Sequence, residues 1–205
     1  MNARAEMPAY RGQLGPAGHH HVVAVSLVIV AEIMLFCGLV AGYLVLRGQA
    51  IEWPPPGQPR LPVGVTALST LLLLLSGWRA FRLSSAVHRS DGAGLRRALL
   101  QVMTLGGAFL VIQGAEWVSL LGYGLTTASS VYGATFYTIV GCHAVHVAAG
   151  LAALGVVTRR VPHSSDSLGS ASVPDALVSP LFGARLFWLF VVAIWPPLYA
   201  LVYLW

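Results

Sequence analysis

Residues 30–45 read Val-Ala-Glu-Ile-Met-Leu-Phe-Cys-Gly-Leu-Val-Ala-Gly-Tyr-Leu-Val, an apolar run with a single carboxylic acid, Glu32. The apolar run extends over residues 22–46, which exceeds the ~20 residues that an α-helix needs to cross a bilayer. A carboxylate in mid-membrane costs at least ~2.5 kcal/mol on insertion scales, so it normally faces a protein interior, water or a protonation partner. The stretch therefore predicts a membrane-spanning helix that carries a functional group.

Four further apolar stretches follow, at residues 61–83, 98–121, 131–157 and 184–205, and the Ser-, Gly- and Pro-rich residues 162–183 are expected to form a loop. Of the 205 residues, 57% are hydrophobic and 9% are charged, which excludes a water-soluble domain of this size. The sequence predicts an all-α, polytopic bundle of five membrane spans over residues 22–205, preceded by a cytoplasmic N-terminal segment at residues 1–21.

The orientation of the bundle is predicted from its basic residues. All 12 are arginines, and with a cytoplasmic N-terminus ten of them fall on the cytoplasmic side, while Arg47 and Arg60 fall outside. Cytoplasmic loops of membrane proteins carry an excess of Arg and Lys, so the bias predicts an N-in/C-out orientation. The same placement accounts for the net charge of +5 without nucleic-acid binding, for which no recognition motif is present.

Polar residues inside the predicted spans are the candidate functional residues. Glu32 lies about ten residues into the first span, and His143 and His146 lie near the centre of the fourth. We expect all three at a shared depth, with the histidines on one helical face. The group is either a proton-accepting or metal-binding cluster, or a hydrogen-bonded contact between helices. A haem or copper site in this chain is not expected, because metal sites usually need three or four ligands.

A second polar group lies nearer the external end of the third span, where Gln113 precedes Glu116 by about one helical turn. We expect Glu116 to reach the external loop or a side chain of the fourth span such as Tyr132 or Tyr137. The six tryptophans are expected mostly near span ends, as in an aromatic belt at the membrane surface.

Several blocks of sequence occur together in a fixed order. They are Ala31 to Arg47 followed by Trp53-Pro-Pro-Pro-Gly57, then Leu71 to Ser76, Gln113-Gly-Ala-Glu-Trp117, Tyr132 to Tyr137, and Gly141 to Gly150 with its two histidines. Jointly, these blocks resemble the subunit III family of haem-copper oxidases, in its short form with five helices.

The resemblance implies a non-catalytic subunit of a bacterial aerobic terminal oxidase of the cytochrome c oxidase type, in the bacterial cytoplasmic (inner) membrane. Its neighbours would be oxidase subunit I, which holds the haems and copper, subunit II and membrane phospholipids. The chain itself would hold no cofactor, no metal and no catalytic residue, so no activity is expected from it alone.

The resemblance also assigns roles to individual residues. Glu32 matches the family's intramembrane glutamate that reacts with carbodiimides, a residue associated with lipid and proton-related roles. Gln113 and Glu116 belong to the family's QxxEW block, and His143 and His146 to its glycine and histidine block. These positions would support lipid binding and proton uptake or O2 access for the partner subunit.

One departure from the family leaves the branch open. The family usually shows an aromatic-His-Phe-Val-Asp run near its C-terminus, whereas residues 187–192 read Phe-Trp-Leu-Phe-Val-Val. A quinol oxidase, an oxidase tied to another electron-donor complex and an accessory subunit of a nitric oxide reductase therefore remain alternatives. From a different class, a free-standing proton-coupled transporter would use Glu32, His143 and His146 as a relay, although no internal repeat supports it.

Overall fold

The computed structural model describes residues 16–83, 92–161 and 175–205. They form α1 (Pro16–Gly48), α2 (Val63–Phe81), α4 (Gly92–Gly122), α5 (Val131–Arg160) and α6 (Asp175–Tyr199), which continues as a π-helical segment, η1 (Ala200–Leu204). Five helices are long and apolar enough to cross a membrane, and the described ranges contain no strand. The predicted all-α bundle of five spans is confirmed, while its orientation stays a prediction.

Three helices begin earlier than their hydrophobic stretches. α1 starts at Pro16, so residues 16–21 of the predicted N-terminal segment are helical, and residues 1–15 lie outside the described ranges. α4 starts at Gly92 rather than at residue 98. A helix continues beyond its apolar part because its backbone groups keep their hydrogen-bond partners until a cap or another partner replaces them.

α6 differs most from the expectation, because it starts at Asp175 inside the predicted loop. Pro180 lies in the second turn and removes one backbone donor, which disfavours a helix at that point. However, Leu177, Leu181 and Ala184 are buried on one face of these turns. Burial of this face stabilises the early turns despite the proline. Residues 162–174 of the predicted loop lie outside the described part of the chain.

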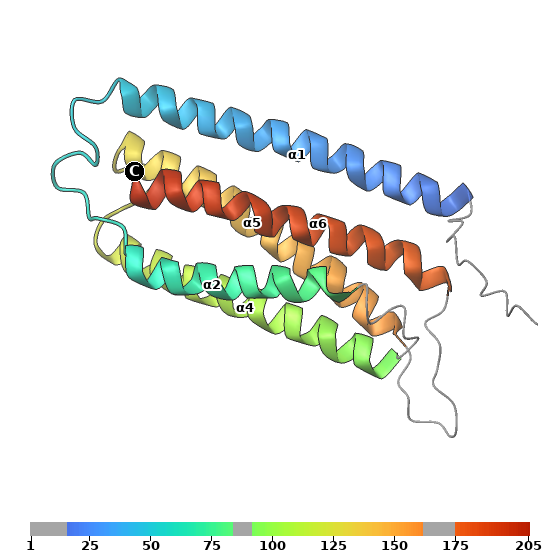
Figure 1. The fold of residues 1–205 in the computed structure, drawn as a ribbon. Helices are drawn as coiled ribbons and strands as arrows, with labels where there is room; N and C mark the ends of the chain where they lie inside the picture. The colour runs from blue at the N-terminus through green and yellow to red at the C-terminus, as the bar shows by residue number, and fades with distance from the viewer. Residues whose placement is uncertain (1–15, 84–91, 162–174) are drawn as a thin grey trace, which may run out of the picture.

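α6 is the central helix of the bundle (Figure 1). It packs on α5, α2 and α1, whereas α2 and α4 form a closely packed antiparallel pair. α1 is the outermost helix and packs on α6 and α5. Only 6% of its most apolar 18-residue stretch is buried within the chain. Most of the surface of α1 is therefore left to lipid or to other proteins.

Trp188 fills the centre of the bundle between α4, α5 and α2. Its side chain is fully buried, and its indole N–H donates to the hydroxyl of Ser76 at 3.1 Å. A Cβ atom at Gly106 or Gly150 would lie 2.5 Å or 2.8 Å from the indole ring, which is too close for any real Cβ atom. These two glycines therefore provide the space for the ring.

Trp195 lies two turns further along α6 and is also fully buried, with its N–H donating to Thr70 at 2.8 Å. The prediction of an aromatic belt is thus wrong for Trp188 and Trp195, because the central position of α6 turns its aromatic residues inward. Trp78 and Trp205, in contrast, are exposed near helix ends.

The connections at the end of the bundle where α1 ends hold the helices in register. Trp53, in the loop after α1, packs edge-on against Tyr43 of α1 and Tyr132 of α5, with ring centroids 5.6 and 5.3 Å away. α5 begins with Ser130 as its N-cap, whose hydroxyl accepts from the backbone N–H of Gly133 at 3.1 Å. The loop thereby links the ends of α1 and α5.

Candidate functional site

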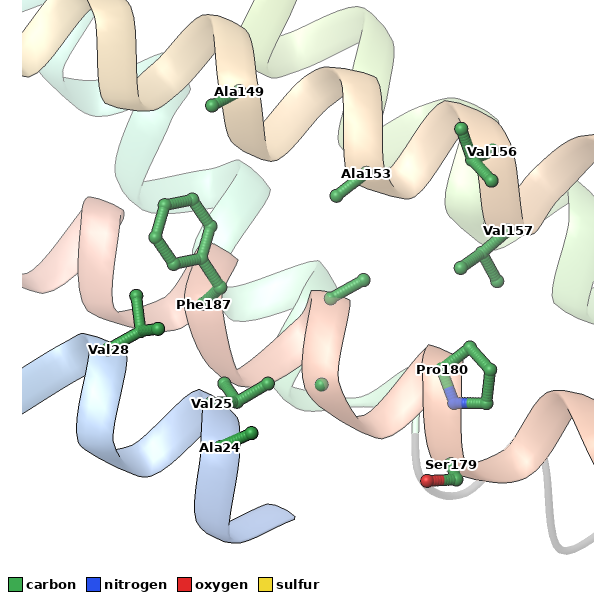
Figure 2. Close-up of a pocket in the computed structure, with 12 residues that line it drawn as sticks. Ala24, Val25, Val28, Ala149, Ala153, Val156, Val157, Ser179, Pro180 and Phe187 are labelled. Carbon is green, nitrogen blue, oxygen red and sulfur yellow. The ribbon is translucent and has the colours of Figure 1, made fainter. Parts of the chain in front are cut away.

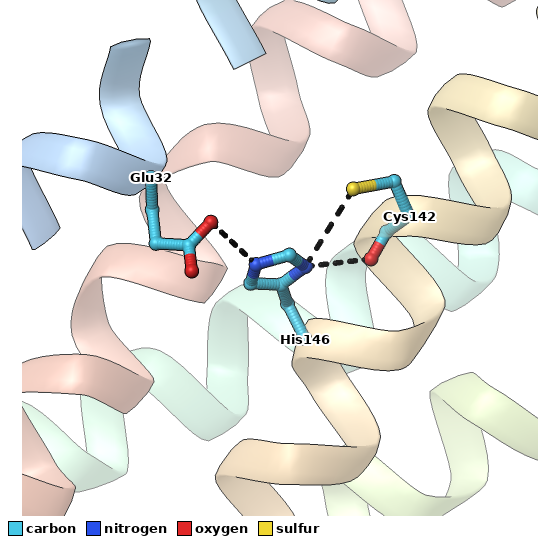
Figure 3. Close-up of polar contacts among 3 residues, drawn as sticks. All are labelled: Glu32, Cys142 and His146. Atoms are coloured by element: carbon cyan, nitrogen blue, oxygen red, sulfur yellow. Dashed lines mark hydrogen bonds and ion pairs between the residues drawn. The ribbon is translucent and has the colours of Figure 1, made fainter. Parts of the chain in front are cut away.

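Glu32 and His146 meet between α1 and α5 (Figure 3). Oε2 of Glu32 lies 2.8 Å from Nε2 of His146. Glu32 is 16 residues from each end of α1, and His146 is 15 and 14 residues from the two ends of α5, so both lie at mid-helix. The side chains are 25% and 12% exposed. The shared depth expected from the sequence brings this acid and this histidine into direct contact.

The second ring nitrogen of His146 determines how protons are placed in the pair. Nδ1 lies 2.7 Å from the backbone carbonyl oxygen of Cys142, one turn earlier in α5, and 3.8 Å from the Cys142 Sγ. A carbonyl oxygen only accepts hydrogen bonds, so Nδ1 carries a hydrogen. Nε2 then either accepts from a protonated Glu32 or donates, as imidazolium, to the carboxylate. In both arrangements one proton lies between the two side chains and the pair is neutral overall.

His143 does not join this pair. Its side chain is fully buried and stacks on the ring of Trp195, with centroids 4.7 Å apart and planes at 25°. Phe109 and Phe36 surround it edge-on, and neither ring nitrogen has a hydrogen-bond partner in the described part of the chain. Three residues turn a helix by about 300°, so His143 faces α6 and α4 while His146 faces α1. The expected cluster of three is therefore a pair and a separate histidine.

Glu116 and Gln113 form a second buried site, and its main partner was missed. The Thr66 hydroxyl of α2 lies 3.0 and 2.9 Å from the two carboxyl oxygens of Glu116. The side-chain amide of Gln113 donates to the same carboxyl group. The expected partners are wrong: the hydroxyl of Tyr137 instead donates to the carbonyl of Leu125 at 2.9 Å. Glu116 therefore links α4 to α2.

A sequence signal for this contact was present in α2. Its small hydroxyl residues, Thr66, Ser69, Thr70 and Ser76, recur at helical spacing and are all buried. Such residues hydrogen-bond across helices in membranes. Their spacing marks the face of α2 that meets α4 and α6, but it does not specify which carboxylate they meet.

An apolar cleft of about 490 Å³ adjoins the Glu32–His146 pair (Figure 2). α1, α5 and α6 all contribute to its walls, and the ring of Phe187 both lines it and packs on His146 at a centroid distance of 6.4 Å. The remaining lining residues are mostly small and aliphatic: Ala24, Val25, Val28, Ala149, Ala153, Val156, Val157, Ser179, Pro180, Gly183 and Ala184. In the described ranges, no three His, Cys, Asp or Glu side chains are close enough together to hold a metal ion.

Comparison with known proteins identifies the family. A family model described as "Cytochrome c oxidase subunit III" matches residues 10–205. The chain is 32% identical over 193 residues to "Cytochrome c oxidase subunit 3" of Synechocystis sp., covering 91% of this chain and 78% of the relative. It is 32% identical to the protein of the same name from Thermostichus vulcanus (91% and 90% covered) and 34% identical to that of Corynebacterium diphtheriae (84% and 82%).

The chain belongs to the cytochrome c oxidase subunit III family. It is therefore a subunit III of a terminal oxidase complex and a multi-pass membrane protein. The resemblance drawn from its sequence blocks is confirmed at the level of the family.

The departure from the subunit III pattern falls on the contact between α6 and α2. Val192, where the aromatic-His-Phe-Val-Asp run would place its acid, is buried. A Cβ atom added to Gly77 of α2 would lie only 2.6 Å from a methyl group of Val192. A closely packed apolar contact thus occupies this position in the bundle.

Proposed function

We propose that this chain is a non-catalytic subunit III of a bacterial aerobic terminal oxidase, in which it stabilises subunit I, holds lipid, and supports proton uptake or O2 access. Subunit I would hold the haems and copper and carry out the reduction of O2, and subunit II would be a further neighbour. The names of the relatives favour the cytochrome c oxidase branch over a quinol oxidase or a nitric oxide reductase. They equally disfavour a free-standing transporter.

The observation that carries the proposal is the Glu32–His146 pair beside the apolar cleft. A partly buried acid and base that share one proton avoid the cost of a lone charge in the membrane. They can exchange the position of that proton without changing their net charge. A group of this kind is suited to passing or buffering protons near a neighbouring catalytic subunit.

The cleft supports the proposed lipid role. Its lining is almost entirely aliphatic, and an acyl chain is the membrane component that matches such a surface. A water-sized group occupies roughly 30 Å³ in a liquid. A volume of about 490 Å³ therefore has room for roughly 16 such groups, which is about the length of one acyl chain. A lipid there would contact Phe187, whose ring packs on His146.

The arrangement of charges supports the proposed membrane and orientation. Arg79, Arg82, Arg159 and Arg160 lie at helix ends, and Arg96 and Arg97 lie in the first turns of α4, all at one end of the bundle. Arg185 lies ten residues after the start of α6 and bonds to the end of α2 there, whereas Arg47 ends α1 at the other end. By the positive-inside rule, this arrangement favours an N-terminus in the bacterial cytoplasm.

Substitutions of Glu32 test the proposal in the purified oxidase complex. Glu32→Gln keeps a hydrogen bond to His146 but no exchangeable acid, so we expect normal haem and phospholipid content with O2 consumption reduced several-fold. The reduction should remain below the ~10²–10⁴ that a direct acid or base catalyst contributes. Glu32→Leu should lower both O2 consumption and phospholipid content.

Glu52→Gln is the matched control, because Glu52 is an exposed acid in the loop after α1. Glu52→Gln should leave haem content, phospholipid content and O2 consumption unchanged. Full activity in Glu32→Leu, or equal losses in Glu32→Gln and Glu52→Gln, would contradict a role for the pair.

A further inference from the structure

The end of α2 carries an excess of positive charge. Arg79 and Arg82 lie in its last turn and at its C-cap, and Arg185 of α6 donates to the carbonyl oxygens of Ala80 and Phe81 at 2.8 and 2.7 Å. The carbonyl groups at a helix C-terminus amount to about half a negative charge. Three guanidinium groups therefore exceed the charge that the helix end can balance.

None of the carboxylates whose side chains the structure describes lies at this end of the bundle. Glu32 lies at mid-helix in α1, Glu52 in the loop after α1, and Glu116 near the opposite end of α4. The one ion pair in the described ranges is that of Glu32 with His146. The first turns of α4, at the same end of the bundle, add Arg96 and Arg97.

Two of these guanidinium groups share one aromatic platform. The Cζ atoms of Arg79 and Arg82 lie 5.6 and 5.0 Å from the ring centroid of Trp78, within the ~6 Å range of cation–π contacts. Arg79 also donates to the side-chain oxygen of Gln101 of α4 at 2.7 Å. Two like charges are thus held close together before any ligand arrives.

A pocket of about 210 Å³ lies at this point between α2 and α4. Its lining consists of Trp78, Arg79, Arg82, Leu83, Ala98 and Gln101. Guanidinium groups match the geometry of phosphate oxygens, and basic pockets between membrane helices on the cytoplasmic side bind anionic head groups. The indole and the two aliphatic residues fit the upper part of a lipid rather than a free ion.

We propose that this pocket binds the phosphate head group of an anionic membrane phospholipid, with Arg79 and Arg82 as its ligands and Trp78 as their support. The site is separate from the cleft beside Glu32, since it lies between α2 and α4 rather than between α1, α5 and α6. This pocket would select its ligand by charge, whereas the cleft would select its ligand by apolar surface.

The test counts lipids on the intact oxidase complex. The complex is delipidated in detergent and titrated with phosphatidylglycerol or, separately, phosphatidylcholine, and bound molecules are counted by native mass spectrometry. Arg79→Gln with Arg82→Gln should weaken one phosphatidylglycerol site about tenfold or more and leave phosphatidylcholine binding unchanged. Trp78→Leu, which keeps both charges, should weaken the same site by a smaller factor.

The matched control removes the same charge from the same end of the bundle. Arg159→Gln with Arg160→Gln acts at the end of α5, outside the pocket, and should retain the site. Equal losses in the two double variants would overturn the proposal in favour of diffuse attraction. Haem content equal to that of the unmodified complex confirms that each variant is assembled.

Two further results would assign the pocket to another ligand. Displacement of phosphatidylglycerol by millimolar inorganic phosphate would overturn the proposal of a lipid ligand in favour of a free anion. Release of a neighbouring subunit by Arg79→Gln with Arg82→Gln, with unchanged lipid counts, would overturn it in favour of an acidic protein partner. Retention of phosphatidylglycerol in phosphate buffer with all subunits present is the expected result.

Discussion

At the scale of single residues, the membrane favours a hydrogen-bond or ion-pair partner within the protein for each polar side chain. Glu32 is partly exposed toward the outside of the bundle and pairs with a base, so a proton can move within a neutral pair. Glu116 is only 6% exposed and is held by neutral donors, Thr66 and Gln113. The first arrangement suits proton exchange and the second suits a fixed link between helices.

Thr66→Val tests the link. The change keeps the shape of the side chain and removes the hydroxyl, so Glu116 loses its contact to α2. We expect a loss of stability of ~0.6 kcal/mol, the average for interhelical hydrogen bonds in a membrane protein, rising toward ~1–3 kcal/mol if the carboxyl oxygen is left unsatisfied. This loss of stability is measured by thermal unfolding of the complex, monitored through the loss of subunit association.

Ser69→Ala is the control on the same helix face, because the Ser69 hydroxyl donates only to the Thr66 carbonyl of its own helix at 3.0 Å. Its effect should be clearly smaller. Equal effects of the two substitutions would argue against a link through Glu116.

The sequence predicts these residues unequally. The depths of Glu32 and His146 follow from helix length, because a straight helix advances by a fixed rise per residue. The partner of Glu116 depends instead on which helix lies beside α4, and nothing local to residues 113–117 specifies α2. For the same reason the sequence groups His143 with Glu32, although the three residues between it and His146 fall about 60° short of a full turn and its side chain faces Trp195.

At the scale of helices, close packing around α6 depends on glycine. Gly106 and its neighbour Gly107 lie in the same helix, but only Gly106 faces Trp188. Gly106→Ala should therefore destabilise the bundle by about 1–3 kcal/mol through overpacking. Gly107→Ala, with no atom within 4 Å of the new Cβ, should be neutral or stabilising by up to ~1 kcal/mol, because alanine favours a helix. Thermal unfolding of both variants in the same detergent provides the comparison.

Trp188→Phe in the Gly106→Ala background should recover part of the loss, because a smaller ring gives space to the new methyl group. Equal melting temperatures for Gly106→Ala and Gly107→Ala would show that Trp188 does not fill the space between α4 and α5.

Helix number and approximate position were predictable from hydrophobicity, whereas helix starts and helix neighbours were not. The early starts of α4 and α6 lie in segments with polar residues or proline, where packing and backbone hydrogen bonds outweigh composition. The burial of Trp188 and Trp195 follows from the central place of α6, and a linear pattern of residues does not reveal which helix is central.

At the scale of the whole molecule, the chain has surfaces that one subunit does not use. α1 leaves most of its apolar surface outward, an apolar cleft opens between α1, α5 and α6, and arginines gather at one end. In a membrane and against oxidase partners, the apolar surfaces contact lipid or protein and the arginines contact head groups or water. Membership of the cytochrome c oxidase subunit III family agrees with this arrangement.

The central claim, that this chain acts as a non-catalytic subunit held against a haem-containing partner, is tested by purification through a tag on this chain in mild detergent. A reduced-minus-oxidised spectrum and mass spectrometry identify what accompanies it. We predict a haem signal together with a large copper-binding subunit. A colourless protein that remains alone through repeated gentle preparations would contradict the account and favour a proton-coupled transporter.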